Sequence, residues 1–177
     1  MEPSTRRKPS DLVAAIIIGC VFLAAAVYMT GIFGVPSFWL EKDIRSSQKI
    51  SDDWTVEGTV SDQMAIYLSY PEDQSSYDYS FYLNRPGLSF GYFFRSGGGS
   101  SGVSEYIEEI VAEGYTDRAF LSMNLAKVAR AEVDDGNNIE TIALDSEKPF
   151  TLILPVNEEE TVTFYDADGN IVETGIN

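Results

Sequence analysis

The sequence contains no histidine and only one cysteine, and both scarcities narrow the chemistry that the protein can perform. Without imidazole, no mechanism can use histidine as a general base or as a metal ligand. Cys20 lies inside an apolar run, which excludes a disulfide within the chain, a cysteine-rich zinc site and a soluble thiol nucleophile. Since no catalytic motif built on other side chains is recognisable, we expect a protein without enzymatic activity and without a cofactor.

Basic residues are scarce as well. The 177 residues include 12 Lys and Arg against 28 Asp and Glu, which gives a formal charge of −16. A nucleic-acid partner is therefore not expected, because phosphate neutralisation requires a basic stripe and the sequence has none. Hydrophobic residues make up 44% of the chain, which is enough for one globular core with an appendage.

Charged residues are missing altogether from Leu12 to Leu40. About 20 helical residues cross the hydrocarbon layer of a bilayer, so this run is long enough to span it. We predict a transmembrane anchor over residues 12–40, with Leu12, Ile16 and Phe22 in the lipid. Trp39 is typical of the aromatic belt at the membrane interface.

The orientation of this anchor follows from its flanks. Three basic residues precede the span and three follow it closely, so the charge bias is weak. Because a long acidic domain translocates easily, we expect residues 1–11 to be a cytoplasmic leader. Residues 41–53 are polar and predict a juxtamembrane stalk, and residues 54–177 then form an extracytoplasmic domain. The absence of an N-x-S/T sequon favours a bacterial cell membrane.

Two processing events would change this anchor. The sequence Ile17-Ile18-Gly19-Cys20 matches a lipobox, in which Cys20 would become a lipidated first residue, but an apolar stretch follows where a polar tether is usual. The run Ala24-Ala25-Ala26 offers a signal-peptidase site, but cleavage there would leave an apolar mature start. A retained helix is therefore the preferred interpretation.

The chain changes character at Trp54. About ten short runs rich in β-branched and aromatic residues follow, separated by turn residues, which predicts a mainly β, antiparallel, sandwich-like domain. One short helix is expected at about residues 104–113. Ser104 is a good N-cap, three glutamates favour the positive end of a helix, and Gly114 ends the pattern.

Two loop motifs have both a structural and a functional interpretation. Asp166, Asp168 and Asn170 have the alternating spacing of a calcium loop, but the rest of an EF-hand is absent and Asp-Gly between two strands predicts a hairpin turn. Residues 97–102 satisfy G-x-G-x-x-G, but the glutamates that follow would repel a pyrophosphate, so a flexible strand-to-helix loop is expected.

Aromatic residues are concentrated between Tyr67 and Phe94. Strand alternation places Tyr82 and Phe93 on the face opposite their aromatic neighbours. If that face is exposed, Tyr82 and Phe93 become a stacking platform for a sugar ring or a peptide. If both faces are covered, these residues belong to the core.

The sequence therefore predicts a single-pass membrane protein with an extracytoplasmic binding or interaction module for a protein or glycan ligand. A second hypothesis is an accessory subunit of a membrane complex, in which Ala15 and Gly19 form a small-xxx-small contact with another helix. A third is a hydrolase that uses paired carboxylates, whose pairing sequence spacing cannot reveal.

Overall fold

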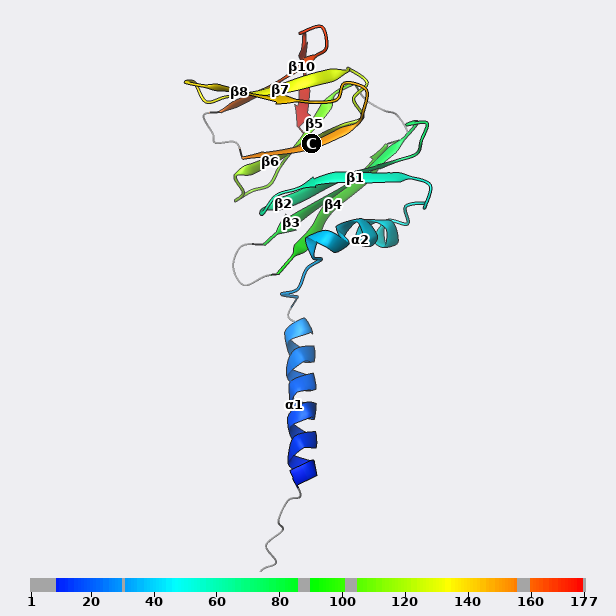
Figure 1. Ribbon diagram of the computed structural model, residues 1–177, viewed down its shortest axis with the longest axis vertical. Coiled ribbons are helices and arrows are strands. Elements are labelled where there is room, and N and C mark those ends of the chain that lie inside the picture. Colours follow the sequence, from blue (N-terminus) through cyan, green and yellow to red (C-terminus); the bar gives the residue numbers. More distant parts are fainter. Residues whose placement is uncertain (1–8, 30, 86–89, 101–104, 156–159, 177) are drawn as a thin grey trace, which may run out of the picture.

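The computed structural model describes residues 9–29, 31–85, 90–100, 105–155 and 160–176. The chain is mainly β, with an apolar helix at its start, as expected. Figure 1 shows this helix, α1, standing apart from a stack of sheets.

Helix α1 runs from Pro9 to Met29. Its side chains are exposed from Leu12 to Met29, and among the described residues it is the one helix long and apolar enough to cross a membrane. Leu12, Ile16 and Phe22 lie on its surface. A helix this apolar on every side is typical of a membrane span, because a helix at a protein surface is apolar on one side only.

The chain that leaves α1 pairs directly with the domain. Val35 exchanges two backbone hydrogen bonds with Tyr92, each 2.8 Å long, and Gly34 donates to the carbonyl of Phe90 at 2.7 Å. Gly34 is required here, because a Cβ atom at this position would lie 2.6 Å from the carbonyl oxygen of Tyr92. The segment after α1 is therefore part of the fold, in contact with the first sheet.

A short 3-10 helix, η1 (Ser37–Trp39), leads into helix α2 (Leu40–Ser47). Leu40 and Ile44 are four residues apart, so they lie on one helix face, and both are fully buried against the first sheet. Ile50 joins the same cluster. The stretch interpreted as a polar stalk thus contains an amphipathic helix that packs on the domain.

The first sheet consists of β1 (Thr55–Val60), β2 (Met64–Tyr70), β3 (Tyr77–Asn84) and β4 (Tyr92–Ser100) in that order, all antiparallel. Residues 97–100 lie within β4, which corrects the flexible loop expected there, and residues 101 and 102 of the same motif lie outside the described residues. A Cβ atom at Gly97 would lie 2.8 Å from the carbonyl oxygen of Tyr79. Glycine, which has no side chain, therefore allows β4 to lie close to β3 here.

The middle sheet has the order β12 (Thr174–Ile176), β5 (Ile107–Val111), β6 (Asp117–Ser122) and β9 (Phe150–Pro155), with β12 parallel to β5. The helix expected at 104–113 is wrong, because residues 107–111 form β5; Ser104 lies outside the described residues. Ile107 packs toward the outer sheet, which is described below, and Ile110 packs toward the first sheet. A strand buries both side chains on opposite faces, whereas a helix would place them on one stripe.

The outer sheet has the order β11 (Ile171–Val172), β10 (Thr161–Asp166), β7 (Val128–Asp134) and β8 (Ile139–Ala143). The layers therefore follow one another as α2, first sheet, middle sheet and outer sheet (Figure 1). Phe81 and Leu121 are part of the core between the first two sheets, and Phe120 and Phe164 of the core between the last two.

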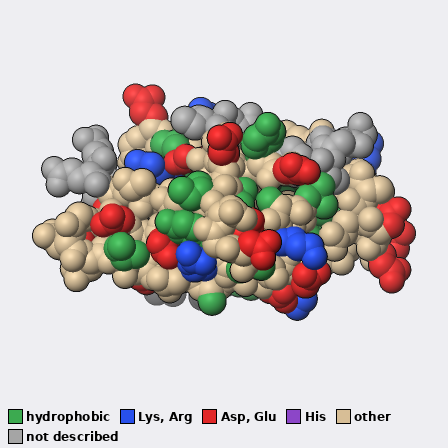
Figure 2. All heavy atoms as spheres, turned by 90° about the horizontal axis from the view of Figure 1, so that it is seen from above, with side chains coloured by type: hydrophobic (Ala, Val, Ile, Leu, Met, Phe, Trp, Pro, Cys, Tyr) green, Lys and Arg blue, Asp and Glu red, His purple; other side chains and the backbone are tan. Residues whose placement is uncertain are grey.

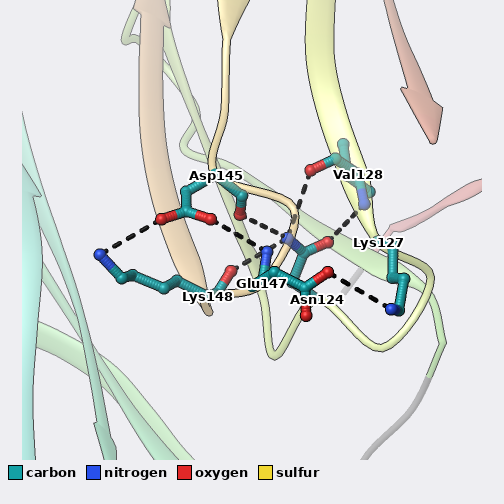
Figure 3. Close-up of polar contacts among 6 residues, drawn as sticks. All are labelled: Asn124, Lys127, Val128, Asp145, Glu147 and Lys148. Atoms are coloured by element: carbon teal, nitrogen blue, oxygen red, sulfur yellow. Dashed lines mark hydrogen bonds and ion pairs between the residues drawn. The ribbon is translucent and has the colours of Figure 1, made fainter. Parts of the chain in front are cut away.

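A buried asparagine connects two loops of the middle and outer sheets by hydrogen bonds (Figure 3). The Nδ2 atom of Asn124 donates to the carbonyl oxygens of Val128, Asp145 and Lys148 at 3.3, 3.0 and 3.0 Å. Its Oδ1 atom accepts from the backbone N–H of Val128 at 2.7 Å. Asn124 has a φ of +58°, a conformation that asparagine tolerates better than most residues. Its side chain therefore replaces backbone pairing between the β6–β7 and β8–β9 connections.

Candidate functional site

The first and middle sheets meet along one side and part along the other. On the closed side, the hydroxyl of Thr59 on β1 lies 2.8 Å from the carbonyl oxygen of Thr151 on β9. On the open side, β4 and β5 border a groove of about 510 Å³. Strand order explains this arrangement, because β1 and β9 are edge strands on the closed side and β4 is the edge strand on the open side.

The floor of the groove is apolar. Phe81 and Leu83 on β3 and Ile110 on β5 form it, and all three are buried members of the core between the sheets. Tyr115 closes one end, and its hydroxyl donates to the carbonyl oxygen of Asn84 at 3.0 Å. The floor of the groove is therefore part of the core, and Tyr115 is attached to the end of β3.

Two arginines border this floor. The guanidinium of Arg85 lies 4.0 Å from the centroid of the Phe93 ring, a cation–π stack. Arg95 is exposed and forms no ion pair with any described residue. The one carboxylate among the described lining residues is that of Glu113. In a chain with a formal charge of −16, the described lining of this groove therefore holds two basic residues and one acidic residue.

A β-bulge brings Arg95 to the groove. Phe81 pairs with Ser96 and Tyr82 pairs with Phe94, so Arg95 has no partner residue on β3. Bulges bend a strand and redirect side chains, and they are common beside binding sites. Beyond the bridge between Val35 and Tyr92, no described strand pairs with the other side of β4. The backbone of this strand is therefore available along the groove.

The two aromatic candidates from the sequence have different positions. Phe93 lines the groove, half-buried beneath Arg85. Tyr82 is fully buried, because α2 covers its face of the sheet. Its hydroxyl donates to Asp43 on α2 at 2.8 Å, and burial together with this bond raises the pKa of Tyr82 above its ordinary value. Tyr82 therefore serves to attach α2.

Asp166, Asp168 and Asn170 form the turn between β10 and β11. The side-chain Nδ2 of Asn170 donates to Oδ2 of Asp166 at 2.9 Å, and the backbone N–H groups of Asp168 and Asn170 donate to its Oδ1 at 2.9 and 2.8 Å. These bonds, with that of the Asn170 side chain the largest contribution, hold the pKa of the Asp166 carboxyl below the ordinary value. Donors of the turn itself thus occupy both carboxylate oxygens of Asp166. Among the described residues no cluster of three acidic or sulfur side chains is arranged for a metal ion. The predicted hairpin turn is present, and calcium binding stays the alternative interpretation of these residues.

Sequence reasoning missed Arg85 and Arg95. A signal was present, because basic residues are few and both of these flank the aromatic β4 segment. It also missed the contribution of β5, since the segment was interpreted as a helix. Trp39, proposed as an interfacial anchor, lies in η1 with 57% of its surface exposed.

Comparisons of this chain with protein-family models, with characterised proteins and with solved structures found no match.

Proposed function

We propose that the protein is a single-pass membrane protein whose sandwich-like β domain is an extracytoplasmic binding module, and that the groove between β4 and β5 is its binding site. The observation that carries the proposal is the combination of an apolar floor, the Arg85–Phe93 stack and Arg95, which forms no ion pair within the described part of the chain. A preformed cleft that combines apolar side chains with a few convergent charged groups is a usual form of a ligand site.

The chemistry of the groove favours an extended acidic peptide. The free side of β4 can accept backbone hydrogen bonds from an added strand, as in other cases of strand addition. Arg85 and Arg95 can pair with carboxylates of the ligand, and the floor formed by Phe81, Leu83 and Ile110 can take an apolar side chain. A glycan would stack on an open aromatic face, but Arg85 already covers a face of Phe93.

The proposed location rests on α1 and on the charge of the domain. A bilayer-spanning length of apolar helix without a buried side chain supports a retained anchor. The acidic domain supports translocation with the leader left in the cytoplasm. Ala15 and Gly19, four residues apart on the surface of α1, keep an accessory subunit as the second candidate, since small residues there allow close approach of another helix.

Removing the Arg95 charge tests the binding site. We expect Arg95→Ala to weaken binding of acidic peptides, selected on an array of extended peptides, by roughly tenfold or more, because a charged hydrogen bond is worth about 1.5–3 kcal/mol. Isothermal titration with the full-length protein in detergent measures the affinity.

Arg130→Ala is the matched control for this experiment. Arg130 stacks on Tyr165 at 4.2 Å, which resembles the Arg85–Phe93 pair but lies on the outer sheet. Its removal should leave affinity unchanged. An array on which acidic peptides bind no better than basic ones, or equal losses for both variants, would contradict the proposed site. Preferential binding of acidic glycans would retain the module but replace the peptide ligand.

A further inference from the structure

The exposed phenylalanines and the exposed tryptophan among the described residues of the domain are gathered at one end of it. Phe33, Phe38, Trp39, Phe90 and Phe94 are each at least half exposed, at 51, 78, 57, 59 and 53%. We call them the proximal aromatic face. Among the described residues after α1 they are all of the exposed phenylalanines and tryptophans. Exposed aromatics scattered singly need no explanation, but a contiguous apolar surface marks an interaction site.

The chain holds this face next to the end of α1. Three residues separate Met29 from Phe33, and a fully extended chain covers at most about 3.5 Å per residue. The backbone pairing of Gly34 and Val35 with Phe90 and Tyr92 then fixes the start of β4 to this short connection. The headgroup layer on each side of a bilayer is about 5–8 Å thick, so the face cannot move far from it.

A groove opens in the same face. It measures about 610 Å³, and Phe33, Val35, Trp39, Tyr92 and Phe94 form its apolar walls. Tyr28 in the last turn of α1 also lines it, so the groove is continuous with the anchor. Lys42 and Asp43 stand at its polar side. The Asp43 carboxylate accepts the hydroxyl of Tyr82, so its charge is partly used within the fold. Lys42 is exposed there and can meet a lipid phosphate.

The distribution of charge along the chain also favours an orientation with the proximal aromatic face toward the membrane. Residues 105–177 contain 17 Asp and Glu against 4 Lys and Arg, whereas residues 31–104 contain 9 against 5. Figure 2 looks at the domain from the end remote from α1, and acidic side chains are scattered across that end. An anionic bilayer therefore repels the remote end far more than the proximal one.

We infer that lipids of the adjacent leaflet occupy this groove and cover the proximal aromatic face, so that the domain lies on the bilayer surface. Aromatic side chains favour the interface, where their rings leave water while polar groups stay hydrated. Phe93 and Phe94 line both grooves, so the peptide groove would then open close to the membrane surface. This inference rests on the anchor in the proposed function but not on the ligand of the peptide groove.

Fluorescence quenching by brominated lipid tests the contact. The full-length chain with Trp39→Phe and Trp54→Phe is placed in nanodiscs of phosphatidylcholine and phosphatidylglycerol, and one reporter is added, either Phe90→Trp or Ile171→Trp. Ile171 is also exposed, at 67%, but lies on the outer sheet, which makes it the matched control. With bromines near the headgroup end of the acyl chains, the Phe90→Trp reporter should lose most of its emission and the Ile171→Trp reporter should keep it.

The outcomes distinguish failure of the proposed lipid contact from failure of the proposed membrane anchor. A chain that stays in the nanodisc while the Phe90→Trp reporter is quenched no more than the control would overturn the lipid contact and leave the anchor intact. A chain that does not enter the nanodisc would overturn both. The native Trp39 provides a second readout that leaves the face unaltered: with Trp54→Phe alone, equal emission in brominated and plain lipid would also contradict the inference.

Discussion

Replacing Asn124 by aspartate is expected to lower the free energy of unfolding by about 3–5 kcal/mol, because the change removes buried donors and adds a buried charge. The Nδ2 atom of Asn124 donates to three carbonyl oxygens, those of Val128, Asp145 and Lys148 (Figure 3). A carboxylate has no hydrogen to donate, so it would face three acceptors at similar distances. The side chain is 5% exposed, so little water can compensate.

The measurement is chemical unfolding of the full-length protein in detergent, followed by far-ultraviolet circular dichroism. Asn137→Asp is the matched control, since Asn137 lies in the exposed turn between β7 and β8 and the chemical change is identical. We expect the control to stay within about 0.5 kcal/mol of the wild type. Equal stability of the two variants would mean that Asn124 does not fasten the two loops.

The second large effect is expected from Phe120→Ala, which should lower the free energy of unfolding by about 3–5 kcal/mol. Phe120 is 1% exposed on the side of the middle sheet that faces the outer sheet. Its ring centroid lies 5.2 Å from that of Phe164 at an interplanar angle of 60°, an edge-to-face contact. Truncation leaves a cavity between two sheets whose strand pairing prevents them from closing over it.

Thermal unfolding of the same preparation, monitored by near-ultraviolet circular dichroism, measures this loss. Ile171→Ala serves as the control, because Ile171 is a large apolar residue of the outer sheet that is largely exposed. Its removal should change the stability by no more than about 0.5 kcal/mol. If Phe120→Ala behaves in the same way, the outer sheet does not depend on this core.

The elements that the sequence predicted correctly are those whose pattern depends on local periodicity. Helix α1 follows from an unbroken apolar run, and the strands after Trp54 follow from alternation. The predicted helix at 104–113 is wrong because the prediction relied on helix-capping residues. The segment is a strand because sheets cover both of its faces, and those neighbouring layers are not visible in the local sequence. Helix α2 was missed although Leu40 and Ile44 have helical spacing, because the surrounding residues are polar.

The candidate site was predictable in part. Alternation placed Tyr82 and Phe93 on one face of the first sheet, whereas the pairing of Phe93 with Leu83 puts Phe93 on the face opposite Tyr82. Which face is open also depends on α2, and α2 was not expected. The bulge that leaves Arg95 without a partner residue on β3 depends on pairing register, which a single sequence does not specify. The glycines at 97–99 were interpreted as flexible, whereas contact with β3 accounts for them.

Labelling of single cysteines in intact cells tests the central claim, a membrane-anchored domain on the outer side, most directly. In a Cys20→Ser chain expressed in a bacterial host, a membrane-impermeant maleimide should label Ala167→Cys, in the exposed turn of the outer sheet, before lysis. It should label Ser4→Cys, in the leader, only after lysis, and both variants should need detergent to leave the membrane. Labelling of Ser4→Cys in intact cells without Ala167→Cys, or release of the intact chain without detergent, would contradict the account.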